Sequence, residues 1–147
     1  MIYKCLVFLA LVVIVSANKN KTSVQDKNLL ITKLAEYIEM SCQQLNKSAA
    51  NMINFLLEDK TDVKTYKKYR SKFIEYRDIL DAYFSAFKHY DFDENDPEFV
   101  IIRDTITDLD KVEKLGEGTK EKALTDLNQS IKSVKILYEF FAAKDKT

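Results

Sequence analysis

The chain has 147 residues, among them 23 basic and 23 acidic side chains, two glycines and one proline. A formal net charge of zero provides no global attraction to nucleic acid, so we expect no nucleic-acid partner. The scarcity of glycine and proline favours long helices that are joined by a few tight connections.

The first 17 residues have the features of a cleavable secretory signal peptide. Lys4 supplies a positive charge, residues 5–15 are all apolar, and short side chains follow up to Ala17. The apolar run is shorter than the roughly 20 residues that a membrane-spanning helix needs. We therefore expect cleavage after Ala17, a secreted domain of residues 18–147, and no stable membrane insertion after cleavage. An uncleaved membrane anchor is the alternative.

Cleavage changes the inventory of charges and thiols. Removing Lys4 leaves 22 basic side chains against 23 acidic ones, and removing Cys5 leaves Cys42 as the single thiol. An internal disulfide is then excluded, so stability must come from packing. Cys42 either lies buried as a small apolar residue or forms a disulfide with a second chain.

The first expected helix begins near Thr22 and extends to about Leu57. Thr22 and Gln25 have the spacing of a capping box. Apolar residues then recur at steps of three or four, at Leu30, Leu34, Ile38, Cys42, Leu45, Ala49, Met52 and Leu56. A break near Asn46, which would give five helices instead of four, is an alternative because Asn and Ser are mediocre helix formers. Thr61 is the expected N-cap of the next helix.

The second expected helix, residues 62–90, has the most regular pattern in the chain. Two sets of side chains each recur every seven residues, and the sets are offset by three. The first set is Tyr66, Phe73, Leu80 and Phe87, and the second is Tyr69, Tyr76, Tyr83 and Tyr90. This spacing is typical of a coiled-coil packing face, which we name the tyrosine seam.

Two more helices are expected in the last third of the chain. Asp96 and Pro97 have the pattern of an N-cap followed by proline at the first helical position, and an apolar stripe continues to Leu115. Gly116 can adopt the left-handed conformation that ends a helix, and the fourth helix is expected from Thr119 to about Ala143. Four amphipathic helices with short turns predict an all-α, up-down-up-down antiparallel four-helix bundle.

The second helix carries the candidate binding site. Its aromatic part consists of Tyr66, Tyr69, Phe73, Tyr76, Tyr83, Phe87 and Tyr90. Its basic patch consists of Lys64, Lys67, Lys68, Arg70 and Lys72. Because a buried tyrosine hydroxyl must reach water or a partner, the seam is a core with hydroxyls at its edge, a cavity for a lipid-like ligand, or an exposed protein-binding stripe. The basic patch either complements acidic residues 91–117 within the bundle or meets an anionic partner.

Few residues could carry out catalysis or hold a metal ion. Cys42 and His89 are a conceivable nucleophile and base, but Cys42 lies on an apolar stripe and nothing nearby marks it as activated. Loop 91–96 has oxygen ligands spaced as at the start of a calcium-binding loop, but Asp96 and Ile102 stand where glycine and glutamate are required. We therefore predict no enzymatic activity, no metal and no cofactor.

Three Asn-x-Ser/Thr sequons begin at Asn20, Asn46 and Asn128. In a secreted eukaryotic protein each is a candidate for N-glycosylation. Asn20 lies in the expected leader of the mature domain and is the favoured acceptor, whereas the other two lie on helices and must face solvent to be used.

Together these features predict a secreted, non-enzymatic helical-bundle protein that binds an extracellular protein partner. The alternative is a carrier that holds a small hydrophobic or lipid-like molecule in a tyrosine-lined cavity. No motif selects a particular partner or tissue.

Overall fold

The computed structural model describes residues 24–90, 92–113 and 118–146, and these residues are all-helical with short connections. The four helices are α2 (Val24–Leu57), α3 (Val63–His89), α4 (Pro97–Glu113) and α5 (Lys120–Asp145). The expected signal peptide, Asn20 and the expected C-cap Gly116 lie outside the described residues. Within the described ranges, none of the helices combines the length and the apolar character needed to cross a membrane.

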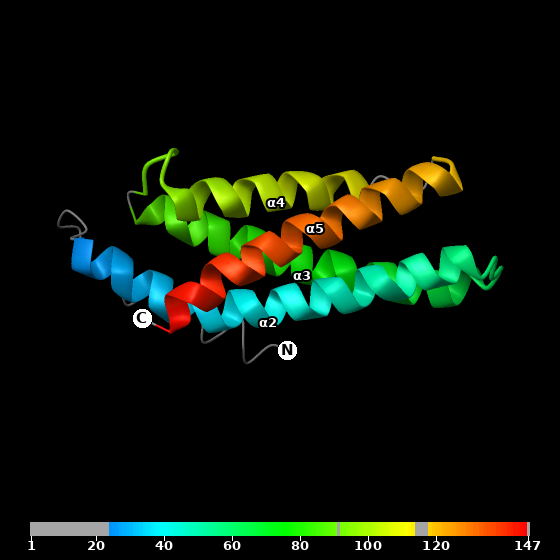
Figure 1. Ribbon diagram of the computed structural model, residues 1–147, viewed down its shortest axis with the longest axis horizontal. Helices are drawn as coiled ribbons and strands as arrows, with labels where there is room; N and C mark the ends of the chain where they lie inside the picture. Colours follow the sequence, from blue (N-terminus) through cyan, green and yellow to red (C-terminus); the bar gives the residue numbers. More distant parts are fainter. Residues whose placement is uncertain (1–23, 91, 114–117, 147) are drawn as a thin grey trace.

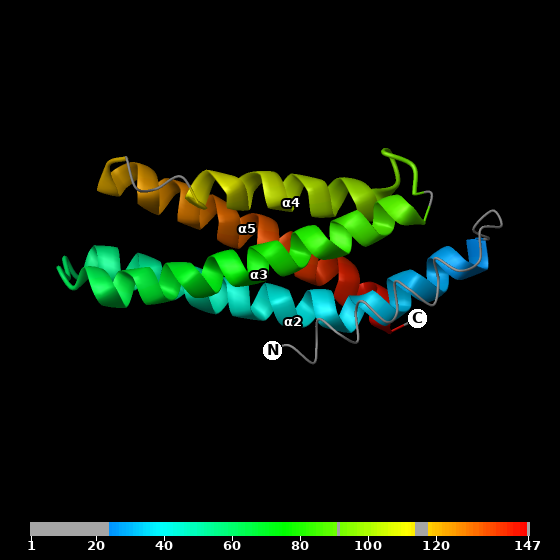
Figure 2. The same ribbon diagram turned by 180° about the vertical axis from the view of Figure 1, so that it is seen from behind.

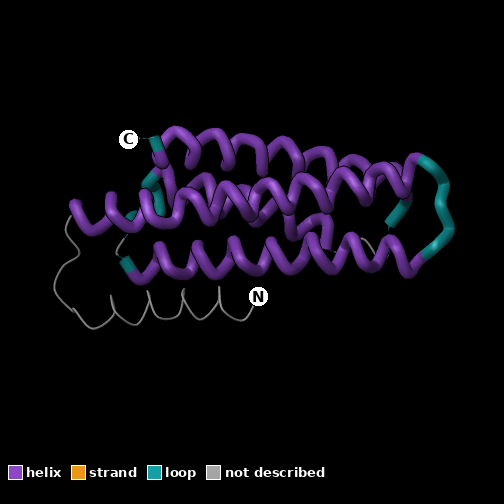
Figure 3. The backbone as a smooth tube through the Cα atoms, turned by 90° about the horizontal axis from the view of Figure 1, so that it is seen from below, coloured by secondary structure: helices purple, strands orange, loops and turns teal. Residues whose placement is uncertain are grey.

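Successive helices run in alternating directions along one long axis (Figure 1). Seen from behind, α2 and α3 form one hairpin, and α4 lies above α3 (Figure 2). Figure 3 shows the helices lying side by side, with connecting loops at the ends of the molecule. Helix α2 packs against both α3 and α5, and α4 packs against both α5 and α3. The described helices therefore form a bundle in which each packs mainly against two others.

Helix α2 is continuous through Asn46, so the alternative with a fifth helix is wrong. Residues on both sides of that position, Leu45 and Ala49, are fully buried. Burial of an apolar face contributes more to helix stability than the small propensity penalty of Asn and Ser. The hydroxyl of buried Ser41 is satisfied within the helix, where it donates to the carbonyl of Tyr37 at 2.9 Å.

The starts of α3, α4 and α5 follow the expected positions closely, with one correction. The expected capping box at Thr22 lies outside the described residues. The N-cap of α3 is Asp62 rather than Thr61, because the Asp62 carboxylate accepts a hydrogen bond of 3.1 Å from the backbone N–H of Lys64. Helix α4 begins at Pro97 as predicted, although the Asp96 carboxylate accepts a bond of 2.8 Å from the N–H of Asp93 in the preceding loop. Thr119 caps α5 through the N–H of Lys122.

The core is one cluster to which all four helices contribute. Its largest fully buried side chains are Phe73, Phe87, Phe141, Ile38, Leu45, Met52, Leu80, Ile102, Leu109, Leu127, Leu137 and Val112. Helix α2 supplies the first face of this cluster, and its long stretch with few charges, residues 40–57, is explained by packing against two helices at once.

Replacing Phe73 by Ala should lower the free energy of unfolding by about 3–5 kcal/mol, because a fully buried ring is lost and a cavity remains. Urea denaturation followed by far-UV circular dichroism measures this loss. Leu57→Ala is the control, since Leu57 is 59% exposed and should cost no more than about 0.5 kcal/mol. Equal losses for the two variants would contradict the burial pattern.

Candidate functional site

The tyrosines of the seam are partly exposed near the start of α3 and buried near its end. Phe73, Leu80 and Phe87 are fully buried, and Tyr83 and Tyr90 are nearly so. Toward the start of the helix Tyr66, Tyr69 and Tyr76 are only partly buried against the core. The seam is therefore a core-packing face whose aromatic rings reach the surface in the first half of α3.

Other aromatic rings fill the space around the buried part of the seam. The ring of Phe87 meets that of Phe92 edge-on at 4.7 Å between centroids, and Phe141 lies 6.4 Å away. Tyr66 packs at 5.3 Å against Phe55 of α2. Desolvation by burial raises the pKa of both Tyr66 and Tyr90.

The basic patch stands on the outer side of the first half of α3. Lys64, Lys67 and Lys68 are exposed, and none of them forms an ion pair with another described residue. Lys72 is held by Glu75 at 2.9 Å. Half-buried Arg70 joins Lys67, Ser71 and Ile74 around a shallow hollow of about 190 Å³.

The expected complementarity between the basic helix and the acidic segment is seen at Arg77. Arg77 Nε lies 3.1 Å from Asp110 Oδ1 of α4, and the side chain of Arg77 is only 19% exposed. Asp108 pairs instead with Lys111 of its own helix at 2.7 Å. Lys64, Lys67 and Lys68, which have no ion pair with another described residue, therefore lie about two and a half to three and a half turns before Arg77.

In the two sequons on helices, polar side-chain atoms are either shielded from solvent or hydrogen-bonded within the helix. Asn46 is half-buried, and its amide oxygen is shielded from solvent. Asn128 is exposed, but its Nδ2 atom donates a hydrogen bond of 2.8 Å to the carbonyl of Leu124. Ser130, the third residue of that sequon, is fully buried.

Of the candidate catalytic and calcium-binding groups, Cys42 is buried, whereas His89 and Asp93 are exposed. Cys42 is fully buried in α2, and burial, aided by the charge of Glu39, raises the pKa of its thiol to about 12. His89 is exposed at the end of α3. In the acidic loop, Asp93 Oδ1 accepts hydrogen bonds from the backbone N–H and the side-chain amide of Asn95 at 2.8 and 3.0 Å. Within the described ranges no three His, Cys, Asp or Glu side chains form a group that could hold a metal ion.

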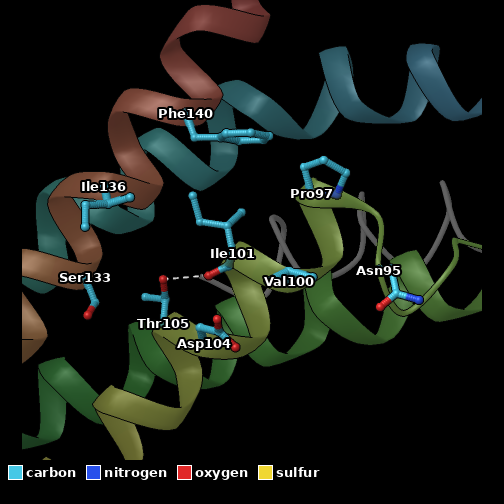
Figure 4. A pocket seen from close by; sticks show the side chains of 9 residues that line it. All are labelled: Asn95, Pro97, Val100, Ile101, Asp104, Thr105, Ser133, Ile136 and Phe140. Carbon is cyan, nitrogen blue, oxygen red and sulfur yellow. Dashed lines mark hydrogen bonds between the residues drawn. The ribbon is translucent and has the colours of Figure 1, made fainter.

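A hollow that the sequence analysis did not predict lies between α4 and α5. The hollow, of about 460 Å³, is lined by Asn95, Pro97, Val100, Ile101, Asp104, Thr105, Ser133, Ile136 and Phe140 (Figure 4). Its apolar members lie off the core-facing stripes of both helices, and such surplus apolar residues are the one signal of it in the sequence. No tyrosine of the seam lines either hollow.

A polar cluster joins α4 to α5 beside this hollow. The carboxylate of Asp108 accepts hydrogen bonds from Lys111 Nζ at 2.7 Å, Ser133 Oγ at 2.5 Å and Gln129 Nε2 at 3.3 Å. Partial burial acts to raise the pKa of Asp108, but these donors outweigh burial and hold the pKa below the usual 3.8.

The thiol of Cys42 should not react with a thiol reagent at pH 8 in the folded protein, because it is buried and remains protonated. A Cys5→Ser variant isolates the signal of Cys42 in an absorbance assay of reagent release. One thiol should react when a denaturant is added. Rapid reaction without denaturant would show that α2 does not bury this residue.

Asp108→Asn should lower the free energy of unfolding at pH 7 by on the order of 1 kcal/mol. A carboxyl group whose pKa is lower in the folded state stabilises the fold above its unfolded pKa, and this contribution vanishes as the pH falls through the folded pKa. The difference between wild type and variant should therefore shrink below about pH 3.8. Thermal or urea unfolding from pH 7 to pH 2 measures it, and a constant difference would rule out the role of the charge.

No protein-family model matches the chain, and comparison with curated proteins and with solved structures gives no match. A helical bundle does not by itself select a function, because this architecture hosts many unrelated activities. The chemistry of the α3 patch and of the α4–α5 hollow is therefore the basis for a functional assignment.

Proposed function

We propose that the protein is secreted after removal of residues 1–17 and binds, without catalysis, an extracellular protein that presents an acidic face. The contact surface is the first half of α3. The observation that carries the proposal is the exposure of Lys64, Lys67 and Lys68 without an ion pair to any other described residue. If N-glycosylated, the secreted protein would carry its glycan at Asn20 in preference to the two sequons on helices.

The three lysines form a compact group on one helix face. Positions 64, 67 and 68 are three and four residues apart, so their side chains project from adjacent turns on the same side. Clustered unpaired cations steer an acidic partner toward the surface and fix its orientation more than they add affinity. A partner that supplies carboxylates at this spacing would neutralise charges that have no ion pair within the described part of the bundle.

The surroundings of the lysines add contacts that are not purely electrostatic. Ile74 lies beside Lys67 and Arg70 in the 190 Å³ hollow, so a partner side chain can bury apolar surface between two cations. Tyr69 is half-exposed on the same half of the helix. Tyrosine and arginine are over-represented among the residues that dominate binding energy in protein interfaces.

The position of this segment in the bundle leaves it accessible. Helix α3 extends past the last described residue of α4, and its first turns lie beside the end of α2 (Figure 1). A partner surface can therefore approach the outer side of α3 there without displacing another described helix.

The carrier alternative gains no support from the hollows of the bundle. A lipid carrier needs a deep cavity with apolar walls, whereas aromatic rings pack around the seam and neither hollow is lined by a seam tyrosine. Binding of a protein by the outer face of α3 is thus the better supported of the two functions.

Replacing Lys64, Lys67 and Lys68 together by Gln should weaken binding to the acidic partner by about tenfold, since each exposed pair is worth about 0.5 kcal/mol. Partners are first captured from extracellular fluid with the wild-type protein and identified by mass spectrometry. Titration calorimetry with the purified partner then gives the affinity, which should fall with added salt for wild type and much less so for the variant.

The matched control replaces Lys33, Lys47 and Lys146, three exposed lysines elsewhere, by Gln. It carries the same net charge as the patch variant and should bind like wild type. An unchanged affinity of the patch variant, or equal losses for both variants, would remove α3 as the site. Lipid that co-purifies with the protein and is released by Tyr69 or Tyr76 substitution would favour the carrier instead.

A further inference from the structure

The hollow between α4 and α5 is a second surface, unrelated to the basic patch of α3. Its walls are Pro97, Val100 and Ile101 of α4 and Ile136 and Phe140 of α5, which converge on one space (Figure 4). At about 460 Å³ it is large enough for one or two apolar side chains from another molecule.

The polar groups in the walls are already satisfied within the protein. Thr105 Oγ1 donates to the carbonyl of Ile101 at 2.8 Å, and Ser133 Oγ donates to Asp108 at 2.5 Å. Asp104 is paired with Arg103 at 3.1 Å. With the hydroxyl hydrogens of Thr105 and Ser133 used internally and five of its nine lining side chains apolar, the hollow is mainly an apolar surface.

The side chain of Ile136 projects from the surface at the edge of the hollow. It is 58% exposed, the only large apolar side chain of α5 in the described part of the chain that is so exposed, and it stands at the edge of the space beside Phe140. A patch that carries both a projecting side chain and an adjacent hollow can receive a copy of itself, as a two-fold symmetric contact requires.

We propose that this surface joins two copies of the chain, whose α5 helices pack antiparallel across a two-fold axis that passes near Ile136. Each Ile136 then enters the space beside Ile101 and Phe140 of the other copy. The contact is small, so the dimer is weak and depends on concentration in the micromolar range.

The charges on the outer face of α5 fit this arrangement and set its direction. Lys132 lies four residues before Ile136, and Glu139 lies three residues after it. At 1.5 Å per residue, antiparallel packing about Ile136 brings Lys132 of one copy within about 1.5 Å along the axis of Glu139 of the other, on the same side. Parallel packing would instead place each charge beside its own kind.

Lys132 and Glu139 are both exposed and can form ion pairs with a second copy. Lys132 is exposed and has no ion pair with another described residue, and Glu139 meets only Lys135, at 3.8 Å, in the described structure. Residues 18–147 carry 22 basic and 23 acidic side chains, a net charge of −1, so long-range repulsion between two copies is small.

Analytical ultracentrifugation of the purified protein, from about 1 μM to about 500 μM, tests the proposal directly. Wild type should pass from monomer to dimer, and Ile136→Glu should weaken the dimer at least about tenfold. Leu57→Glu is the matched control because Leu57 is equally exposed, at 59%, but lies at the end of α2. Ile136→Ser serves as a second, milder variant should Ile136→Glu fail to give the far-UV spectrum of wild type.

Charge exchange tests the antiparallel geometry. Lys132→Glu alone and Glu139→Lys alone should each weaken the dimer, and the double variant should restore it because both cross-pairs re-form. A wild type that stays monomeric at every concentration, or an Ile136 variant that associates like wild type, would overturn the proposal. A double variant weaker than either single variant would overturn the antiparallel arrangement.

Discussion

The simultaneous burial of α2 against α3 and α5 is the constraint on which the rest of the fold depends. The fully buried residues Ile38, Cys42, Leu45 and Met52 lie along the 34-residue length of this helix. Because the thiol of Cys42 is free and buried, the described part of the chain is held by packing and not by a cross-link. Apolar burial of this kind is the dominant favourable term in folding, and it also keeps α2 continuous through Asn46.

The two candidate surfaces follow from how the other helices are arranged on α2. Helix α4, with 17 residues, is shorter than α3, with 27, and no described helix covers the outer side of the first turns of α3, where the lysines are exposed. Helices α4 and α5 are joined by the Asp108 cluster, and the apolar hollow opens beside it. A basic face and an apolar face are thus carried by different hairpins, which would allow partner binding and self-association to occur independently.

Much of the fold could be predicted from spacing alone, because the apolar stripes of all four helices are regular. The seam residues Phe73, Leu80 and Phe87 are buried as the heptad pattern indicates. The partial exposure of Tyr69 could not be predicted, since a heptad pattern does not show how far the neighbouring helices cover each turn of the seam. The hollow lined by Ile101 and Ile136 could not be predicted either, although both residues lie off the core-facing stripes. Its shape depends on how α4 and α5 are rotated about their axes, which a stripe pattern does not specify.

The proposed partner binds an outer face of a bundle that does not open. Hydrogen–deuterium exchange of the free protein and of its complex with the captured acidic partner tests this claim most directly. We expect the amides of residues 38–52 to exchange slowest in both states, and added protection on binding to be confined to residues 63–72. Faster exchange in α2 on binding would mean that the bundle opens to receive its ligand, and would contradict the account.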